Sequence, residues 1–272
     1  MSASESDAPE LRKPTLWECF ATAVHFLTRV TISKRLAACV DVDHAMALNR
    51  AVVFFPFVGG LIGIFTGGVL VGLCSLGVPG LLAALLAIGV EAYFTGAFHE
   101  DAFADVCDAL GGGWTREQVL EIMKDSRLGT YGTIGLVVGV GARAVAMASI
   151  ASSDLFCAFA TIVAAAMIGR LAIVLFMVTT EPIASRHSQA RDVSGTQSGQ
   201  RVLIAILLAS PFGVAWAVAL QWVAAFSLLA CLVVLSWFRR LVLRRINGTT
   251  GDTLGASGFL AQLVVLSGAT IT

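Results

Sequence analysis

Six long segments of this 272-residue chain contain almost no charged side chains: 51–76, 79–98, 129–151, 155–179, 202–220 and 222–238. A helix needs about 20 mainly apolar residues to cross a bilayer, so each segment is a candidate crossing. The composition agrees, because 57% of the residues are hydrophobic and 13% are charged, whereas a soluble domain usually carries about 25% charged residues. The segments predict an all-α, polytopic membrane helical bundle and exclude an ordinary soluble domain.

Two further segments complete the predicted architecture. Residues 253–271 are apolar but hold Gly, Ser and Thr, so they are a weaker candidate that brings the expected total to about seven transmembrane helices. In LWECFATAVHFLTRV (16–30), apolar side chains recur at helical spacing between charged ones, which is typical of an N-terminal amphipathic helix lying at the membrane interface. The polar residues 1–14 do not resemble a secretory signal peptide and are expected to be a disordered tail, which leaves 15–272 as a single integral membrane domain.

The basic residues predict the orientation of the bundle. Outside the spans, Lys and Arg fall before residue 51 and in 116–127, 186–201 and 239–245, whereas the connections near 77–78, 152–154 and 221 contain none. Cytoplasmic loops of membrane proteins carry the excess of Lys and Arg. We therefore expect the basic segments to face the cytoplasm and the final helix to end on the opposite side.

Charge and cysteine content do not support two other classes of function. The net charge is zero, which gives no indication of a nucleic-acid partner. The six cysteines are scattered singly and form no CxxC pair, so they are expected to be small apolar side chains and not a disulfide or zinc framework.

An acidic cluster, HEDAFADVCDALGGG (99–113), directly follows the second apolar segment. Asp101, Asp105 and Asp108 have i, i+4, i+7 spacing, which places them on one helical face with neighbouring Cβ atoms about 5–6 Å apart. Two like charges at ~6 Å repel by roughly 3 kcal/mol at an effective dielectric constant of ~20. A hard divalent cation, Mg²⁺, is the counter-charge that such carboxylates favour. The alternative is a solvated acidic helix face.

Two neighbours of this cluster have open roles. His99 is a metal ligand, a proton carrier, a phosphate contact or an ordinary interfacial histidine; Phe103 excludes the HExxH pattern of zinc proteases. Glu91 lies about two turns inside the second apolar segment. A carboxylate at that depth costs roughly 2.5–3.5 kcal/mol to insert, so it tends to face a functional cavity and is a candidate addition to the metal site.

The cluster ends at Gly111–Gly113, which we expect to stop the helix through a left-handed residue. Thr115 and Gln118 then predict a capping box for a second helix that reaches KDSRLG (124–129), with Lys124 in its last turn. Lys124 and Arg127 either pair with Asp125 or Glu121, or hold a phosphate. Carboxylates for a metal beside cations for a phosphate are the pattern that phosphoryl transfer requires.

Three charged residues lie farther along the chain. Arg170 is near the predicted cytoplasmic half of its helix, from which it would reach an anionic substrate. Arg143 is nearer the outer half and is expected to pair within the bundle or to extend toward the interface. Asp252 lies in NGTTGDTLGAS (247–257). Its role is either that of an ordinary helix N-cap or that of a ligand in a phosphate- or metal-binding turn.

Together these motifs resemble one family, the cobalamin synthases or adenosylcobinamide-GDP ribazoletransferases. The resemblance covers nearly the whole chain, in the order FLTRV (26–30), FPFVGGLIG (55–63), TGAFHEDAFADVCDALGGG (95–113), EIMKDSRLGTYG (121–132) and TTGDTLGA (249–256). It implies a multi-spanning membrane enzyme that needs Mg²⁺. Together with the orientation expected from the basic segments, we expect a bacterial inner-membrane enzyme whose active site is on the cytoplasmic face. The implied reaction joins adenosylcobinamide-GDP to α-ribazole, or to its 5′-phosphate, and releases GMP.

The resemblance also implies roles for individual residues. Ala102 stands where the family commonly has Gly, and the loop 181–201 matches only loosely, so Arg186 and Arg191 are weak assignments to substrate contact. The expected catalytic residues are Asp101, Asp105, Asp108, His99, Lys124 and Arg127. The expected substrate-binding residues are Lys124, Asp125, Ser126, Arg127, Arg170 and Asp252. The expected metal ligands are Asp101, Asp105 and Asp108, together with Glu91, which is added because of its depth in the second apolar segment and not because of the resemblance.

Two other functions use similar residues. A membrane phosphotransferase acting on CDP-alcohols would need the same acids, but its Ala-Arg after the third carboxylate is missing here. An ion-coupled transporter would use Glu91, Arg143 and Arg170 as an ion path, although the acids gather at one face and no internal repeat is visible. Whether the chain forms a homo-oligomer stays open.

Overall fold

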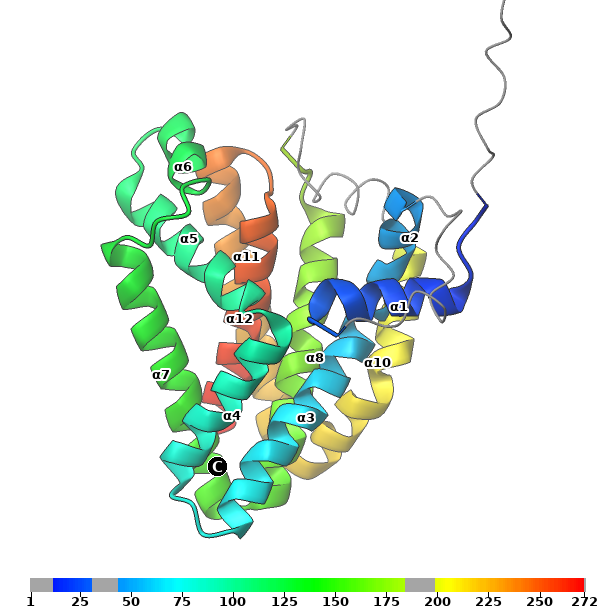
Figure 1. Ribbon diagram of the computed structural model, residues 1–272, viewed down its shortest axis with the longest axis vertical. Coiled ribbons are helices and arrows are strands. Elements are labelled where there is room, and N and C mark those ends of the chain that lie inside the picture. Colours follow the sequence, from blue (N-terminus) through cyan, green and yellow to red (C-terminus); the bar gives the residue numbers. More distant parts are fainter. Residues whose placement is uncertain (1–11, 31–43, 184–198, 272) are drawn as a thin grey trace, which may run out of the picture.

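The computed structural model describes residues 12–30, 44–183 and 199–271. In this part of the chain the regular elements are helices, and an isolated parallel bridge joins Pro182 to Thr249. Figure 1 shows one bundle with α6 at one end and the C-terminus at the other. The elements are α1 (Leu16–Leu27), α2 (His44–Ala51), the 3₁₀ helix η2 (Val52–Phe54), α3 (Phe55–Ser75), α4 (Gly80–Thr95), α5 (Phe98–Gly112), α6 (Arg116–Ile122), α7 (Thr130–Ser153), α8 (Leu155–Thr179), α10 (Gly199–Leu220), α11 (Trp222–Ile246) and α12 (Gly251–Gly268).

Five helical runs are long and apolar enough to cross a membrane: Met46–Ser75, Thr130–Ser153, Leu155–Thr179, Gly199–Leu220 and Trp222–Ile246. They correspond to five of the predicted spans. The predicted span 79–98 is interrupted, because α5 follows α4 at a bend of 94°, and only the two together count as a sixth crossing. The all-α multi-pass fold is confirmed, whereas the predicted number of about seven crossings is not.

The last helix explains the difference in number. α12 lies where the weak seventh span was expected, but it is not among the described helices that are apolar enough to cross. Most of its residues are buried, and it packs closely on α8, where a Cβ added to Gly169 would lie 2.9 Å from the carbonyl oxygen of Gly258. A helix surrounded by protein does not need an apolar lipid-facing surface, so its Gly, Ser and Thr residues serve packing instead.

α8 is the helix around which the bundle packs. It is apolar on all sides and buried along most of its length, as expected for a helix in the interior. On α3, Gly59 and Gly63 allow the two backbones to approach closely. A Cβ at Gly59 would lie 2.6 Å from the carbonyl oxygen of Ala166, and one at Gly63 would lie 2.6 Å from Cα of Val163. The FPFVGGLIG segment is therefore a helix-packing motif of the small-xxx-small type.

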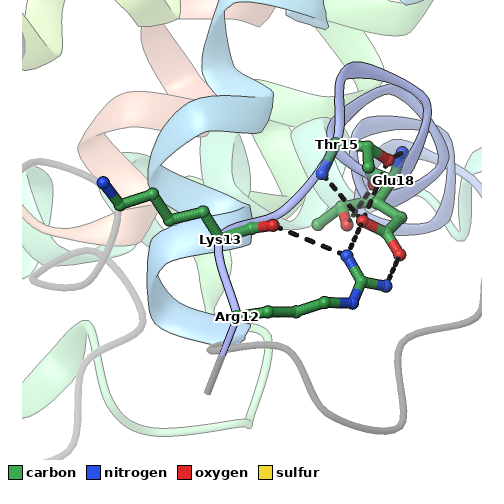
Figure 2. A network of polar contacts seen from close by, with 5 residues as sticks. Arg12, Lys13, Thr15 and Glu18 are labelled. Carbon is green, nitrogen blue, oxygen red and sulfur yellow. Dashed lines mark hydrogen bonds and ion pairs between the residues drawn. The ribbon is translucent and has the colours of Figure 1, made fainter. Parts of the chain in front are cut away.

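α1 lies across the bundle at a steep angle to α3 (Figure 1). Thr15 and Glu18 form a capping box at its start, and the guanidinium of Arg12 donates to both carboxylate oxygens of Glu18 (Figure 2). The hydrogen bonds from Arg12 and from the Thr15 amide lower the pKa of Glu18 to about 2. Of the predicted apolar stripe, Leu27 is buried, whereas Leu16 is 78% exposed.

Residues 1–11, most of the expected tail, lie outside the described residues, and so does Cys39. No disulfide joins any two of the five cysteines that the structure describes, which are Cys19, Cys74, Cys107, Cys157 and Cys231. Arg186 and Arg191 also fall outside the described ranges.

The first structural prediction concerns the α3–α8 contact. Gly63→Ala should lower the free energy of unfolding by about 1–3 kcal/mol, because the added methyl group overpacks the contact with Val163. Gly68→Ala is the matched control on the same helix, since a Cβ there meets no atom within 4 Å. Its effect should be neutral or slightly stabilising. Thermal unfolding in detergent micelles measures both, and equal effects would contradict the close approach.

Candidate active site

The site begins at the bend between α4 and α5. Gly96 and Ala97 have left-handed backbone, with φ of 81° and 55°, and the Ala97 amide donates to the Ala92 carbonyl (2.8 Å) at the end of α4. The end of α1 supports this turn. The amide of Arg29 donates to the carbonyl of Phe94 (2.8 Å), and a Cβ on Gly96 would lie 2.9 Å from Nε of Arg29. Position 96 therefore favours glycine for its φ angle, and the Arg29 side chain packs against it.

Asp101, Asp105 and Asp108 lie on the more open side of α5. Asp101 is exposed, and Asp105 and Asp108 are partly exposed. The neighbouring residues that face the bundle are buried: Ala102, Ala104, Val106 and Ala109. This alternation gives α5 an apolar inner face and an acidic outer face.

The start of α12 brings a fourth carboxylate to this face. A Cβ on Gly255 would lie 2.5 Å from Cβ of Ala102, so α5 and α12 are in close contact at this point. Asp252 is one turn before Gly255, and repulsion from Asp101, Asp252 and Asp108 acts on Asp105. Ala102 is accommodated because its neighbour on α12 is a glycine. The N-cap of α12 is Thr250, so the N-cap interpretation of Asp252 is wrong, and Asp252 lies in the first turn.

Asp108 has a further role at the start of α7. Its Oδ2 accepts a hydrogen bond from the Gly129 amide (2.7 Å), and its Oδ1 accepts one from the Gly132 amide (2.8 Å). These amides belong to the N-terminus of α7, where the first N–H groups have no partner within the helix and the helix dipole favours a negative charge. Asp108 thus caps a helix that is distant in sequence.

The end of α5 differs from its predicted form. The helix stops at Gly113, but this residue has φ −86° and is not left-handed. The glycine is required by space, since a Cβ there would lie 2.7 Å from a side-chain methyl of Val119. The predicted capping box of Thr115 and Gln118 is confirmed. The helix is shorter than predicted, because it ends at Ile122 and leaves Lys124 outside.

Three long-range hydrogen bonds place the 124–127 segment beside the start of α12. Arg116 donates from Nε to the carbonyl of Ile246 (2.8 Å), and Arg245 donates to the carbonyl of Gly113. The hydroxyl of Thr250 donates to the sulfur of Met123 (3.1 Å). The residues expected to bind phosphate and the residues around Asp252 therefore lie at the same end of the bundle.

Within this segment, Lys124, Ser126 and Arg127 are exposed. The guanidinium of Arg127 binds Asp125 with Nη2–Oδ2 of 2.6 Å, which is the pairing that the sequence left open. The hydrogen bonds from the side chain and amide of Arg127 lower the pKa of Asp125 to about 2. This pair is ionised at physiological pH, and Lys124 presents the second positive charge.

The remaining predicted residues are buried within the bundle. Glu91 is 4% exposed and accepts hydrogen bonds from Thr66 (3.1 Å) and Arg143 (3.1 Å), so its described partners are not the aspartates. Arg143 pairs within the bundle, as one of the two expected arrangements required. His99 and Arg170 are 2% and 1% exposed. Among the described side chains, Nε2 of His99 and Nε of Arg170 are buried without a hydrogen-bond partner.

The structure thus separates the predicted site into two parts. Asp101, Asp105 and Asp252 lie together on the open side, with the 124–127 segment at the same end, whereas Glu91, His99 and Arg170 are interior. Among the described residues, no three or more His, Cys, Asp or Glu side chains are arranged to hold a metal ion by themselves. Sequence reasoning assigned no role to Arg29 or Thr250, although they lie within the FLTRV and TTGDTLGA motifs.

These features define a multi-pass helical membrane protein with a carboxylate-rich site at one end of its bundle. Residues 19–270 match the family described as cobalamin-5-phosphate synthase, and the chain belongs to this family. It is 37% identical over 260 residues to an adenosylcobinamide-GDP ribazoletransferase of Sinorhizobium sp, covering 93% of this chain and 95% of the relative. The enzyme of that name from Rhizobium etli is 39% identical over 255 residues, with 90% and 94% coverage. One from Shewanella baltica is 34% identical over 252 residues, with 91% of each chain covered. No solved structure gives a significant match.

The two roles of the aspartates predict opposite effects on stability. Asp108→Ala should lower the free energy of unfolding by about 1–2 kcal/mol, because two amides of α7 lose their acceptor. Asp105→Asn should raise it by about 0.5 kcal/mol, because one of several repelling charges is removed. Thermal unfolding of both variants checks this, and an Asp105→Asn protein as unstable as Asp108→Ala would refute the repulsion.

Proposed function

We propose that this chain is an adenosylcobinamide-GDP ribazoletransferase, which joins adenosylcobinamide-GDP to α-ribazole or its 5′-phosphate and releases GMP. Membership of the cobalamin-5-phosphate synthase family and the names of the similar enzymes support the substrates. The observation that carries the proposal is the meeting of α5 and α12, where the Ala102–Gly255 contact brings Asp101, Asp105 and Asp252 together. This acidic surface lies at the same end of the bundle as the exposed cations of 124–127.

The donor set at this surface suits Mg²⁺. Asp101 and Asp105 are carboxylates one turn apart that repel each other and are accessible from outside. Mg²⁺ is usually held by one or two carboxylates together with substrate phosphates and waters, so a site without three protein ligands is compatible with it. We propose Asp101 and Asp105 as the ligands, with Asp252 opposite. Asp108 and Glu91 are less suitable, since their oxygens already bind the α7 amides and Arg143.

When bound, the ion would neutralise charge on the pyrophosphate of adenosylcobinamide-GDP. The residues of the chain have two tasks around it, to neutralise the leaving phosphate and to accept a proton. Lys124 and Arg127 neutralise the negative charge on the phosphate of the leaving GMP. To do this, Arg127 breaks its ion pair with Asp125 and binds the phosphate instead. The hydroxyl of α-ribazole attacks the phosphorus that bears cobinamide, and the bond from that phosphorus to the bridging oxygen of GMP breaks. The proton of the attacking hydroxyl passes to a carboxylate of the site.

An aspartate is the better candidate for this base than His99. His99 is 2% exposed, inside the bundle, and Arg143 and Arg170 lie near enough to oppose a positive charge on its ring. A general base must reach the proton that it removes. The open side of α5 satisfies this condition, so we assign the proton to Asp101 or Asp105 and an internal role to His99.

The reaction is tested with purified protein in detergent. Adenosylcobinamide-GDP, α-ribazole and Mg²⁺ should give GMP and a corrinoid product in equal amounts, and chelation of the metal should stop the reaction. Asp105→Asn should lower kcat by about 100-fold or more while the protein stays folded. Gly68→Ala is the control that should keep full activity. A protein that releases CMP from a CDP-alcohol, or that only transports ions, would refute the proposal.

We further propose that the aspartates face the cytoplasm of a bacterial inner membrane. The basic segments at 116–127 and 239–245 lie at the end of the bundle with α6, and the C-terminus lies at the opposite end (Figure 1). Alkaline phosphatase fused after residue 272 should therefore be active, and a fusion within 116–127 inactive. The reverse result would invert the orientation.

A further inference from the structure

A buried arginine connects the two sides of the α4–α5 bend. Arg143 of α7 is 2% exposed. Its Nη2 lies 3.1 Å from Oε2 of Glu91 on α4, and its Nη1 lies 2.8 Å from Oε1 of Glu100 on α5. Thr66 of α3 donates to the same oxygen of Glu91 (3.1 Å), which fixes the far end of the network. The guanidinium thus holds one carboxylate before the bend and one after it.

A second contact attaches α5 to the same arginine. The guanidinium carbon of Arg143 lies 5.6 Å from the ring centroid of Phe259 on α12, within the range of a cation–π interaction. Phe259 stacks on Phe103 of α5, with ring centroids 4.5 Å apart. Glu100 and Phe103 are three residues apart, so the inner face of α5 is attached at two successive turns.

These attachments set the position of the acidic face. Glu100 directly precedes Asp101, and Phe103 is two residues before Asp105. An α-helix has 3.6 residues per turn, so residues on its inner and outer faces alternate along the chain. Rotation or tilt that displaces the inner face of α5 therefore displaces its outer face as well. A shift of α5 about the bend would therefore separate Asp101 and Asp105 from Asp252.

We infer that Arg143 is a positioning residue, which acts through Glu100 to hold the aspartates of α5 opposite Asp252. The inference rests on the proposed function, in which these aspartates hold a divalent cation. A buried ion pair adds little net stability, because desolvation offsets its attraction, so its geometric effect is the more important one. Arginine suits this task, since its planar fork donates to two carboxylates in fixed directions, whereas lysine offers a single flexible ammonium group.

The test uses Arg143→Lys and Glu100→Gln in the full-length protein. Binding of Mn²⁺, a probe for the Mg²⁺ site, is measured by electron paramagnetic resonance without substrate, and kcat and KM are measured separately. Each variant should weaken Mn²⁺ binding and lower kcat by about tenfold or more, as substitutions behind metal ligands usually do. KM for α-ribazole should change by less than about twofold, since no contact to that substrate is removed.

Gly63→Ala is the destabilised control, because its overpacked contact is on the α3–α8 interface, away from α5. It should unfold at a lower temperature but keep the Mn²⁺ affinity and kcat of the unsubstituted protein. Arg143→Lys and Glu100→Gln proteins that behave like this control would overturn the inference, as would an unsubstituted protein that binds no Mn²⁺. If Mn²⁺ binding weakens as expected but the unsubstituted protein releases no GMP, the positioning role stands and the proposed reaction fails.

Discussion

The 94° bend between α4 and α5 is the constraint on which the site depends. A straight continuation of α4 would place the aspartates along the direction of the spans, where charge is costly to bury. The bend turns α5 away from the direction of α4, so that its apolar face packs inward and its acidic face stays open. Gly96 and Ala97 provide the backbone angles, and Arg29 packs against the turn from α1. The FLTRV and TGAFHED motifs are therefore two halves of one structural feature.

The charged residues of the interior and of the open surface have different physical tasks. Inside, Arg143 satisfies Glu91 and Glu100, because an unpaired charge there would carry the full cost of desolvation. On the open side, Asp101, Asp105 and Asp252 repel one another without a counter-charge among themselves. The interior ion pairs hold the helices in place. The repulsion between the carboxylates on the open side would be relieved by a cation bound together with substrate phosphates. Such unfavourable local arrangements are typical of functional sites.

The amount that sequence reasoning could predict depended on how local each signal was. The spans were predicted because apolar length is a property of one segment, and the Thr115–Gln118 capping box because its partners are three residues apart. The prediction of a left-handed glycine at the end of α5 was wrong. Gly113 is required because a side chain there would clash with Val119, and its φ angle is not left-handed. The role of Asp108 was also not predicted. It has the same helical spacing as the other aspartates, but it caps α7 by binding the amide of Gly129, 21 residues farther along the chain.

By itself, the amino-acid sequence determined a multi-pass helical bundle with its basic segments at alternate connections, because hydropathy and charge act segment by segment. It also determined that aspartates would share one face of a helix, since helical spacing is a local property. Only the tertiary structure decided that α12 is an interior helix, that Glu91 binds Arg143, and that Asp252 joins Asp101 and Asp105. These contacts depend on where two backbones can approach each other. At Ala102 and Gly255 that distance is set by two residues 153 positions apart in the sequence.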